Sequence, residues 1–222
     1  MTELWERFAY YGMRSLLILY LIDTTTGGMG WNRAHASHLY GWYNGLAYLT
    51  PVAGGWIADR YLGNSRSLIL GSALISAGHF SLAMGQGWIF YGGLTLIVLG
   101  TGFFKPNVYT MVGQLYGSPD PRRDAGFTLY YMGINLGALF GPLVCAWLAA
   151  NPRYGWSYGF GAAGTAMLIG LLFFLSTRRV WLRDVTSGSP IGQPAEFPRS
   201  RPSSDEWKRI LALGIITVFV VF

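Results

Sequence analysis

Long apolar stretches alternate with short polar ones along most of this chain. Six of them are long enough to cross a hydrocarbon core of about 30 Å as a helix, which takes about 20 residues. They cover residues 3–22, 38–58, 67–84, 89–115, 124–149 and 157–176. The pattern therefore predicts an all-α integral membrane protein in which residues 1–177 form a bundle of six transmembrane helices.

The pattern changes after the sixth stretch. Residues 178–208 are polar, with Pro190 and three further prolines among serine, glycine and arginine, which predicts a basic cytoplasmic linker. Residues 209–222 are apolar again but too few to cross a bilayer, and we expect them to be the truncated start of a seventh helix. Six helices, a linker and a new helix are the plan of one half of a twelve-helix transporter, in which each half holds inverted three-helix repeats.

Composition agrees with a membrane protein. Charged residues make up 12% of the chain and hydrophobic residues 52%, against about 25% charged residues in soluble domains. The 31 glycines suit membrane helices that pack closely, and the 9 tryptophans suit the membrane–water interfaces. The single cysteine, Cys145, lies in an apolar run and has no partner for an internal disulfide.

The basic residues gather in alternate loops, after the second, fourth and sixth apolar stretches, whereas the other loops carry only Arg33 and Arg153. By the positive-inside rule the basic loops are cytoplasmic, and the even number of helices places the N-terminus on the same side of a plasma (inner) membrane. The formal charge of +6 is then a sign of topology and not of nucleic-acid binding. No cleavable signal peptide is visible, because Glu3, Glu6 and Arg7 occupy the place of a basic leader.

Ionisable and phenolic side chains recur along the first stretch. They are Glu3, Glu6, Arg7, Tyr10, Tyr11 and Arg14. At about 100° per residue they fall within an arc of about 140°. A charge at the bilayer centre costs about 2.5–3.5 kcal/mol, so this stripe is expected to face protein or a water-filled cavity, where a glutamate that alternates between Arg7 and a proton could act in a proton relay. For Glu3 and Glu6 the alternative is a helix start at the interface, where carboxylates favour the positive end of the helix dipole.

A further cation, Lys105, lies inside the fourth apolar stretch, next to Pro106 and close to Gly102. Proline and glycine kink or thin a helix and free backbone groups toward a cavity. The alternative is a lysine that extends to the interface. Together with Arg14, Lys105 would place two cations near the middle of the membrane, which suits an anionic group such as a carboxylate.

Four motifs occur in order along the chain. They are ELWERFAYYG at residues 3–12, GGWIADRYLG at 54–63, KPN at 105–107 and FTLYYMGINLG at 127–137. Together they resemble the signatures of the proton-dependent oligopeptide transporter family (POT, or PTR) of the major facilitator superfamily, and the resemblance extends from Glu3 to about Thr177. It implies the N-terminal half of a carrier that moves di- and tripeptides with protons by alternating access, and not an enzyme.

The resemblance also implies roles for the charged residues. Glu3, Glu6 and Arg7 would couple proton movement to transport. Arg14 and Lys105 would hold the carboxylate of the peptide, and Lys105 would pair with a glutamate of the first helix when no peptide is bound.

Other residues of the motifs would line the peptide site or control access to it. Asp59 and Arg60 would belong to the cytoplasmic gate. A second-helix histidine that some animal members carry is replaced here by Gly41, so proton handling would rest on carboxylates. The uncharged residues of the peptide site would be Tyr10, Tyr11, Tyr48 and Asn135.

The implied partners are a di- or tripeptide, the lipid bilayer and a C-terminal six-helix bundle, which would supply an acidic residue for the amino group of the peptide. Protons would be the coupling ion, with no cofactor and no metal. Within the same family, a carrier of nitrate or another small anion is the alternative. A membrane-embedded receptor or enzyme is more remote, because no nucleophile elbow is present and the histidines are scattered. We expect His79 to be an interior histidine, and His35 and His38 to lie in or beside the outer loop.

Overall fold

The computed structural model describes residues 1–85, 87–114 and 120–184. Six α-helices and one π-helical segment make up this part of the chain, with no strand among the described residues. The elements are α1 (Thr2–Ile22), α2 (Arg33–Ile57), η1 (Ala58–Leu62), α3 (Asn64–Met84), α4 (Trp88–Gln114), α5 (Arg123–Ala150) and α6 (Trp156–Asp184). The predicted all-α bundle is confirmed. The predicted linker begins inside α6, which runs to Asp184; the rest of the linker and the predicted seventh helix lie outside the described residues.

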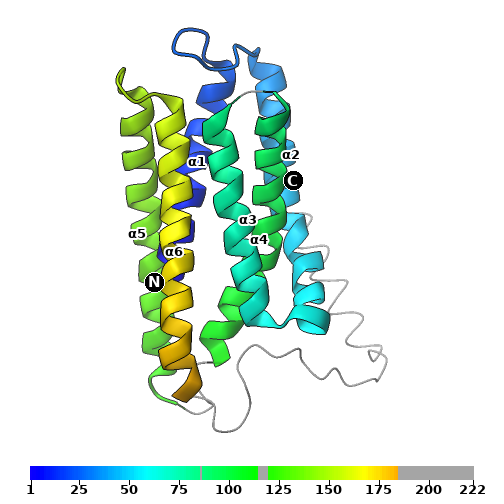
Figure 1. Ribbon diagram of the computed structural model, residues 1–222, viewed down its shortest axis with the longest axis vertical. Helices are drawn as coiled ribbons and strands as arrows, with labels where there is room; N and C mark the ends of the chain where they lie inside the picture. The colour runs from blue at the N-terminus through cyan, green and yellow to red at the C-terminus, as the bar shows by residue number, and fades with distance from the viewer. Residues whose placement is uncertain (86, 115–119, 185–222) are drawn as a thin grey trace.

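The helices run side by side along the long axis of the molecule (Figure 1). Helix α3 packs against α4 and α6, α1 packs against α5 and α6, and α2 packs mainly against α4. Helix α1 therefore has one side on the α5–α6 pair and leaves another side toward α2 and α4.

Four of the described helices, α3 to α6, are long and apolar enough to cross a membrane. Helix α1 has 21 residues but is less apolar, because it carries Glu3, Glu6, Arg7 and Arg14. Helix α2 is longer, with 25 residues, and is also less apolar than these four. Of the six predicted spans, four are therefore long and apolar enough to cross a membrane. Helices α1 and α2 pack into the same bundle.

Glycines bring α1 and α5 into backbone contact. A side chain at Gly137 would collide with the carbonyl oxygen of Leu4, and one at Gly141 would collide with that of Phe8. Small residues at such positions let membrane helices approach closely. This contact fixes the height of α1 along α5, and with it the depth of the charged residues on α1.

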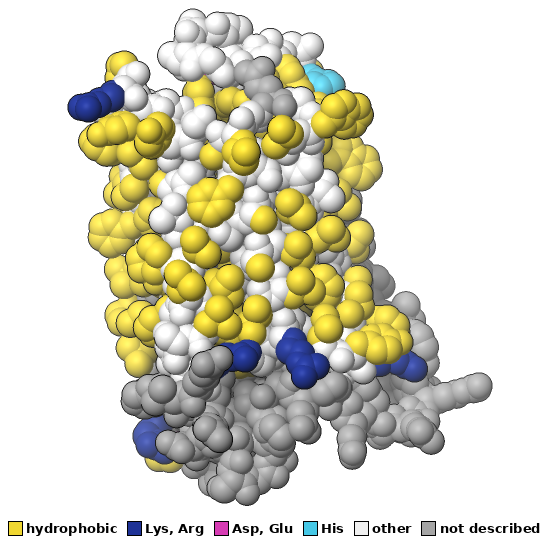
Figure 2. Space-filling model, viewed as in Figure 1, with side chains coloured by type: hydrophobic (Ala, Val, Ile, Leu, Met, Phe, Trp, Pro, Cys, Tyr) yellow, Lys and Arg dark blue, Asp and Glu magenta, His cyan; other side chains and the backbone are white. Residues whose placement is uncertain are grey.

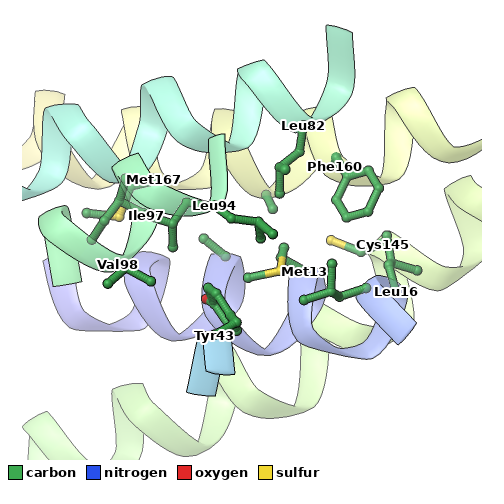
Figure 3. Packing of buried hydrophobic residues seen from close by; sticks show 14 of the residues in the cluster. Met13, Leu16, Tyr43, Leu82, Leu94, Ile97, Val98, Cys145, Phe160 and Met167 are labelled. Atoms are coloured by element: carbon green, nitrogen blue, oxygen red, sulfur yellow. The ribbon is translucent and has the colours of Figure 1, made fainter. Parts of the chain in front are cut away.

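The buried core takes side chains from every helix (Figure 3). Met13 of α1 lies among Leu94 and Ile97 of α4, and Cys145 of α5 and Phe160 of α6 are fully buried. The core is continuous across the bundle, so the six helices form one packing unit.

At one end of the bundle, Asp23 ties the loop after α1 to the start of α6. Its carboxylate accepts hydrogen bonds from Thr26 Oγ1 at 2.6 Å, Thr25 N at 3.0 Å and Trp156 Nε1 at 3.1 Å. The hydrogen bonds from Thr26, Thr25 and Trp156 favour the charged form and hold the pKa of Asp23 well below its usual range.

The exterior matches a membrane protein. Figure 2 shows hydrophobic side chains over most of the height of one face, with basic side chains mainly toward the lower end and one at the upper left. That is the end where the α2–α3 connection is drawn (Figure 1). On this face the basic side chains border the apolar band instead of interrupting it, as expected of loops at a membrane surface.

Candidate functional site

The charged residues of α1 lie partway along the bundle and not at its end. A Cβ atom on Gly133 of α5 would lie 3.6 Å from the Cβ of Leu4, so the two residues share one height. Gly133 is ten positions beyond Arg123, where α5 starts, which is about 15 Å along a helix. The N-terminus is accordingly seen partway down the molecule (Figure 1). Glu3 and Glu6 are thus buried partway along the bundle, which argues against the alternative of carboxylates at an interfacial helix start.

Arg7 forms an ion triplet with the two glutamates. Its Nε lies 3.0 Å from Glu3 Oε1 and 2.5 Å from Glu6 Oε2. The three side chains are only 11%, 7% and 2% exposed, in the order Arg7, Glu3, Glu6, and Tyr130 of α5 lies beside Glu3. A buried charge needs such a partner, because losing it leaves an uncompensated charge. Both glutamates are therefore committed to Arg7 in this conformation.

Arg14 is held by phenol groups of two helices. Its Nε donates to Tyr40 Oη of α2 at 2.6 Å, and its Nη1 is 3.4 Å from Tyr10 Oη. The guanidinium carbon also lies 5.7 Å from the centre of the Tyr40 ring. Within the part of the chain that the structure describes, no carboxylate pairs with Arg14. Its charge is thus positioned but not neutralised.

Lys105 lies between two tyrosine rings. Its Nζ is 4.9 Å from the ring centre of Tyr10 and 5.0 Å from that of Tyr48, distances at which a cation is attracted to the ring face. Lys105 is nine positions before Gln114, where α4 ends, or about 14 Å along the helix. It is partly buried, well away from the end of its helix, which argues against the alternative of a lysine extending to the interface.

The implied pairing of Lys105 with a glutamate is not made here. No carboxylate of the described residues lies within ion-pair distance of its Nζ, and Glu3 and Glu6 turn to Arg7 instead. With all groups ionised, three cations (Arg7, Arg14 and Lys105) face two carboxylates, which leaves one excess positive charge. A cation without a carboxylate partner favours an anionic ligand.

Three of the other expected site residues, all tyrosines, lie in this cluster, and Asn135 does not. Tyr10 and Tyr48 bracket Lys105, and the ring of Tyr11 lies 5.1 Å from that of Tyr10. Asn135 lies on an exposed part of α5 and donates to the carbonyl of Tyr131 at 3.0 Å. Among the described residues no hydrogen bond links Asn135 to the cluster.

The expected gate residues lie elsewhere. Asp59 and Arg60 belong to η1, at the end of α2. The guanidinium carbon of Arg60 lies 5.7 Å from the ring centre of Trp56 and 5.9 Å from that of Tyr61. They are therefore a separate site at one end of the bundle, and their role in gating stays a prediction.

Sequence reasoning missed two tyrosines of α2. Tyr40 anchors Arg14, and Tyr43 is 3% exposed, with a hydroxyl that has no hydrogen-bond partner among the described residues. The available signal was spacing, because Tyr40 precedes Tyr48 by eight positions, about two helical turns, and so lies near the same face. That signal becomes useful only once α2 is known to face the stripe of α1.

The histidines behave as expected. His79 is fully buried, with Nδ1 2.7 Å from the carbonyl oxygen of Ile75, so it is an interior histidine. His35 and His38 lie in the first turns of α2 and are exposed, beside the loop that precedes it. Across residues 1–85, 87–114 and 120–184, no group of three His, Cys, Asp or Glu side chains is placed to hold a metal ion.

Comparison with known proteins bears on this site. The sequence model of the POT family matches residues 65–197. Over 178 residues the chain is 47% identical to "Peptide transporter YePEPT" of Yersinia enterocolitica subsp. palearctica serotype O:3 (strain YE-P4), which covers 78% of this chain and 34% of the relative. Over 226 residues it is 38% identical to the "Di-/tripeptide transporter" of Lactococcus lactis subsp. lactis (strain IL1403), which covers 100% of this chain and 44% of the relative.

Solved structures agree with these sequence relatives. A crystal structure of a peptide transporter POT in complex with sulfate superposes with a TM-score of 0.79 at 40% identity, over 99% of this chain and 44% of that one. A POT family transporter in complex with 5-aminolevulinic acid gives a TM-score of 0.79 at 33% identity, again over 99% and 44% of the two chains. This chain therefore spans less than half the length of the proteins it matches.

Proposed function

This chain belongs to the POT family, and we propose that it is the N-terminal half of a carrier that moves di- and tripeptides together with protons. The observation that carries the proposal is the placement of Arg14 and Lys105. Both cations lie on a tyrosine-lined wall, free of carboxylate partners among the described residues, and beside a buried arginine–glutamate triplet. The relatives named above are peptide transporters, which supports a peptide as the substrate.

A peptide fits this wall through its carboxylate. Arg14 and Lys105 offer the positive charge, while Tyr10, Tyr11 and Tyr48 offer ring faces and hydroxyls to the peptide backbone and side chains. Asn135 would add an amide from α5. The amino group of the peptide would meet an acidic residue of a second six-helix bundle, which is part of the proposal.

The triplet would couple the proton to the peptide. A peptide carboxylate that arrives at Lys105 also attracts Arg7 and weakens its hold on Glu3 and Glu6. A glutamate without a cation in a low-dielectric cavity takes up a proton more readily. Peptide and proton would then be carried in the same step, with protons as the coupling ion and no cofactor.

Movement would follow alternating access, in which two bundles rock about a site near the middle of the membrane. Asp59 and Arg60 would act in the cytoplasmic gate. The protein would lie in the plasma membrane with its N-terminus in the cytoplasm, as the distribution of basic loops indicates.

Uptake by the full-length protein in liposomes tests the substrate. With an inward proton gradient, labelled dialanine should accumulate, and a panel of unlabelled di- and tripeptides should compete with it. Single amino acids and nitrate should compete little. If nitrate competes and no peptide does, the protein is an anion carrier; neither the sequence relatives nor the solved structures support that alternative.

A further inference from the structure

An apolar crevice lies on the side of α1 that faces away from the charged stripe. Its volume is about 570 Å³, within the range of about 300–1,000 Å³ that small-molecule sites occupy. It contains none of the residues assigned above to peptide or proton. Its apolar lining comes from four helices and includes Trp5, Phe8, Phe80, Val144, Leu148 and Ile169.

The crevice opens to the surface between α5 and α6. Val144 of α5 is 39% exposed, and Ile169 of α6 is 41% exposed. Both helices are long and apolar enough to cross a membrane, and α6 exposes further apolar side chains, such as Leu168 and Leu172. A molecule that enters the crevice from this side therefore comes from the lipid phase.

The depth of the crevice corresponds to one leaflet. At its outer end stands Tyr158, whose ring lies 5.3 Å from that of Tyr154, which in turn lies 6.1 Å from Trp147. Such aromatic groups mark the membrane–water interface. At its inner end stands Ile169, eleven positions further along α6. This is about 16 Å of helix, close to half of a hydrocarbon core of about 30 Å.

A cation lies at the outer end. The loop between α5 and α6, residues 151–155, carries Arg153, which is exposed and whose guanidinium has no partner in the part of the chain that the structure describes. Figure 2 shows a basic side chain at the upper left, at the end where Figure 1 draws this loop. Ser157 and Tyr158, which carry hydroxyl groups, line the crevice four and five positions further along the chain. An apolar slot one leaflet deep with a cation and hydroxyls at its mouth matches an anionic phospholipid, whose phosphate a basic residue attracts.

We propose that this crevice binds one anionic phospholipid, with an acyl chain between α5 and α6 and the headgroup phosphate at Arg153. The acyl chain would pack on Trp5 and Phe8, the back of the helix that carries the charged stripe. A zwitterionic lipid can carry the same chains and phosphate, but its ammonium group offsets the attraction between that phosphate and Arg153. The proposal does not depend on peptide transport, because lipid retention can be measured without it.

Native mass spectrometry of the full-length protein tests the headgroup. The protein is mixed with equal amounts of phosphatidylglycerol and phosphatidylcholine that carry identical acyl chains. One phosphatidylglycerol should be retained with about a fivefold preference, which corresponds to about 1 kcal/mol for one basic residue at an anionic surface. Arg153→Gln should remove the preference, whereas Arg33→Gln, which changes an exposed arginine at the start of α2, should keep it. Equal retention of the two lipids, or equal effects of the two substitutions, overturns the proposal.

A second pair of variants tests the acyl chain. Gly161 lines the crevice, and the nearest atom to a side chain placed there is Ala83 Cβ at 3.9 Å, so Gly161→Leu can fill the slot without a clash at Cβ. It should lower the retention of both lipids several-fold, and Leu172→Phe, on the same helix outside the crevice, should not. Unchanged retention in Gly161→Leu overturns the proposal. If Gly161→Leu fails to fold in a thermal melt, the Arg153→Gln comparison still decides.

Discussion

Arg7, Arg14 and Lys105 each carry one positive charge, but Arg7 has very different surroundings from the other two. Arg7 lies between two carboxylates, at 3.0 Å and 2.5 Å. Arg14 is held by a tyrosine hydroxyl at 2.6 Å, and Lys105 by two tyrosine rings. A phenol orients a cation but does not cancel its charge, whereas a carboxylate neutralises it. The comparison teaches that the neighbouring groups, and not charge alone, decide the role of each cation. Arg7 is neutralised by the glutamates, whereas Arg14 and Lys105 remain available to an anion.

The largest expected effect tests the glutamate side of this division. Glu6→Gln keeps the size of the side chain and an acceptor for Arg7 but cannot carry a proton. Uptake of dialanine driven by a pH gradient should be abolished, while exchange of labelled for unlabelled dialanine across the membrane should persist. Both are measured in liposomes that contain the full-length protein. Gradient-driven uptake at the wild-type rate would show that Glu6 does not couple the proton.

The two arginines should differ in what they do for stability. Arg7→Gln leaves two buried glutamates without their cation, which costs about 3–5 kcal/mol of folding free energy when a buried pair is broken. Arg14→Gln removes a cation that neutralises no carboxylate of the described residues, so the fold should lose far less. Thermal melts of the two variants in the same detergent compare them directly. Equal drops in Tm would contradict the view that Arg7, but not Arg14, neutralises buried carboxylates.

Lys105 should affect the substrate more than the fold. Lys105→Gln removes a charged contact to the peptide carboxylate, worth about 1.5–3 kcal/mol, or on the order of a tenfold to a hundredfold loss of affinity. Competition against labelled dialanine measures it, with dialanine amide as the matched control because it lacks the carboxylate. The loss should be large for the acid and small for the amide. Equal losses for both would place Lys105 away from the carboxylate.

Much of this fold can be predicted from the sequence, because apolar length and charged interruptions are local properties. The six apolar stretches correspond to the six helices, and only two ends differ by more than three residues. Helix α2 starts at Arg33 and not at residue 38, because the Asn32 side chain accepts a hydrogen bond from His35 N at 2.8 Å and caps it. Helix α6 continues past residue 176 to Asp184, because apolar character marks where a helix meets lipid and not where its hydrogen bonds stop.

The site could be predicted only in part, for a related reason. The arc of α1 follows from helical periodicity, so its charged face was visible in the sequence. Which carboxylate meets which cation depends on the height at which helices pack, and Gly137 and Gly141 set that height through backbone contacts with α1. The choice of Arg7 over Lys105 by the glutamates, and of Tyr40 by Arg14, is therefore a property of the assembled bundle.

The smallest expected effect compares a tyrosine hydroxyl that orients a cation with one that does not. Tyr40→Phe removes the hydroxyl that accepts from Arg14 Nε but leaves the charge of Arg14 in place, so KM for dialanine should rise only several-fold with kcat little changed. Tyr43→Phe is the matched control, three positions along the same helix. Its hydroxyl is buried without a partner among the described residues, and removing such a group is close to neutral or slightly stabilising. If both variants raise KM equally, Arg14 does not need Tyr40 to hold it, and the contrast between a neutralised Arg7 and an oriented Arg14 loses its structural basis.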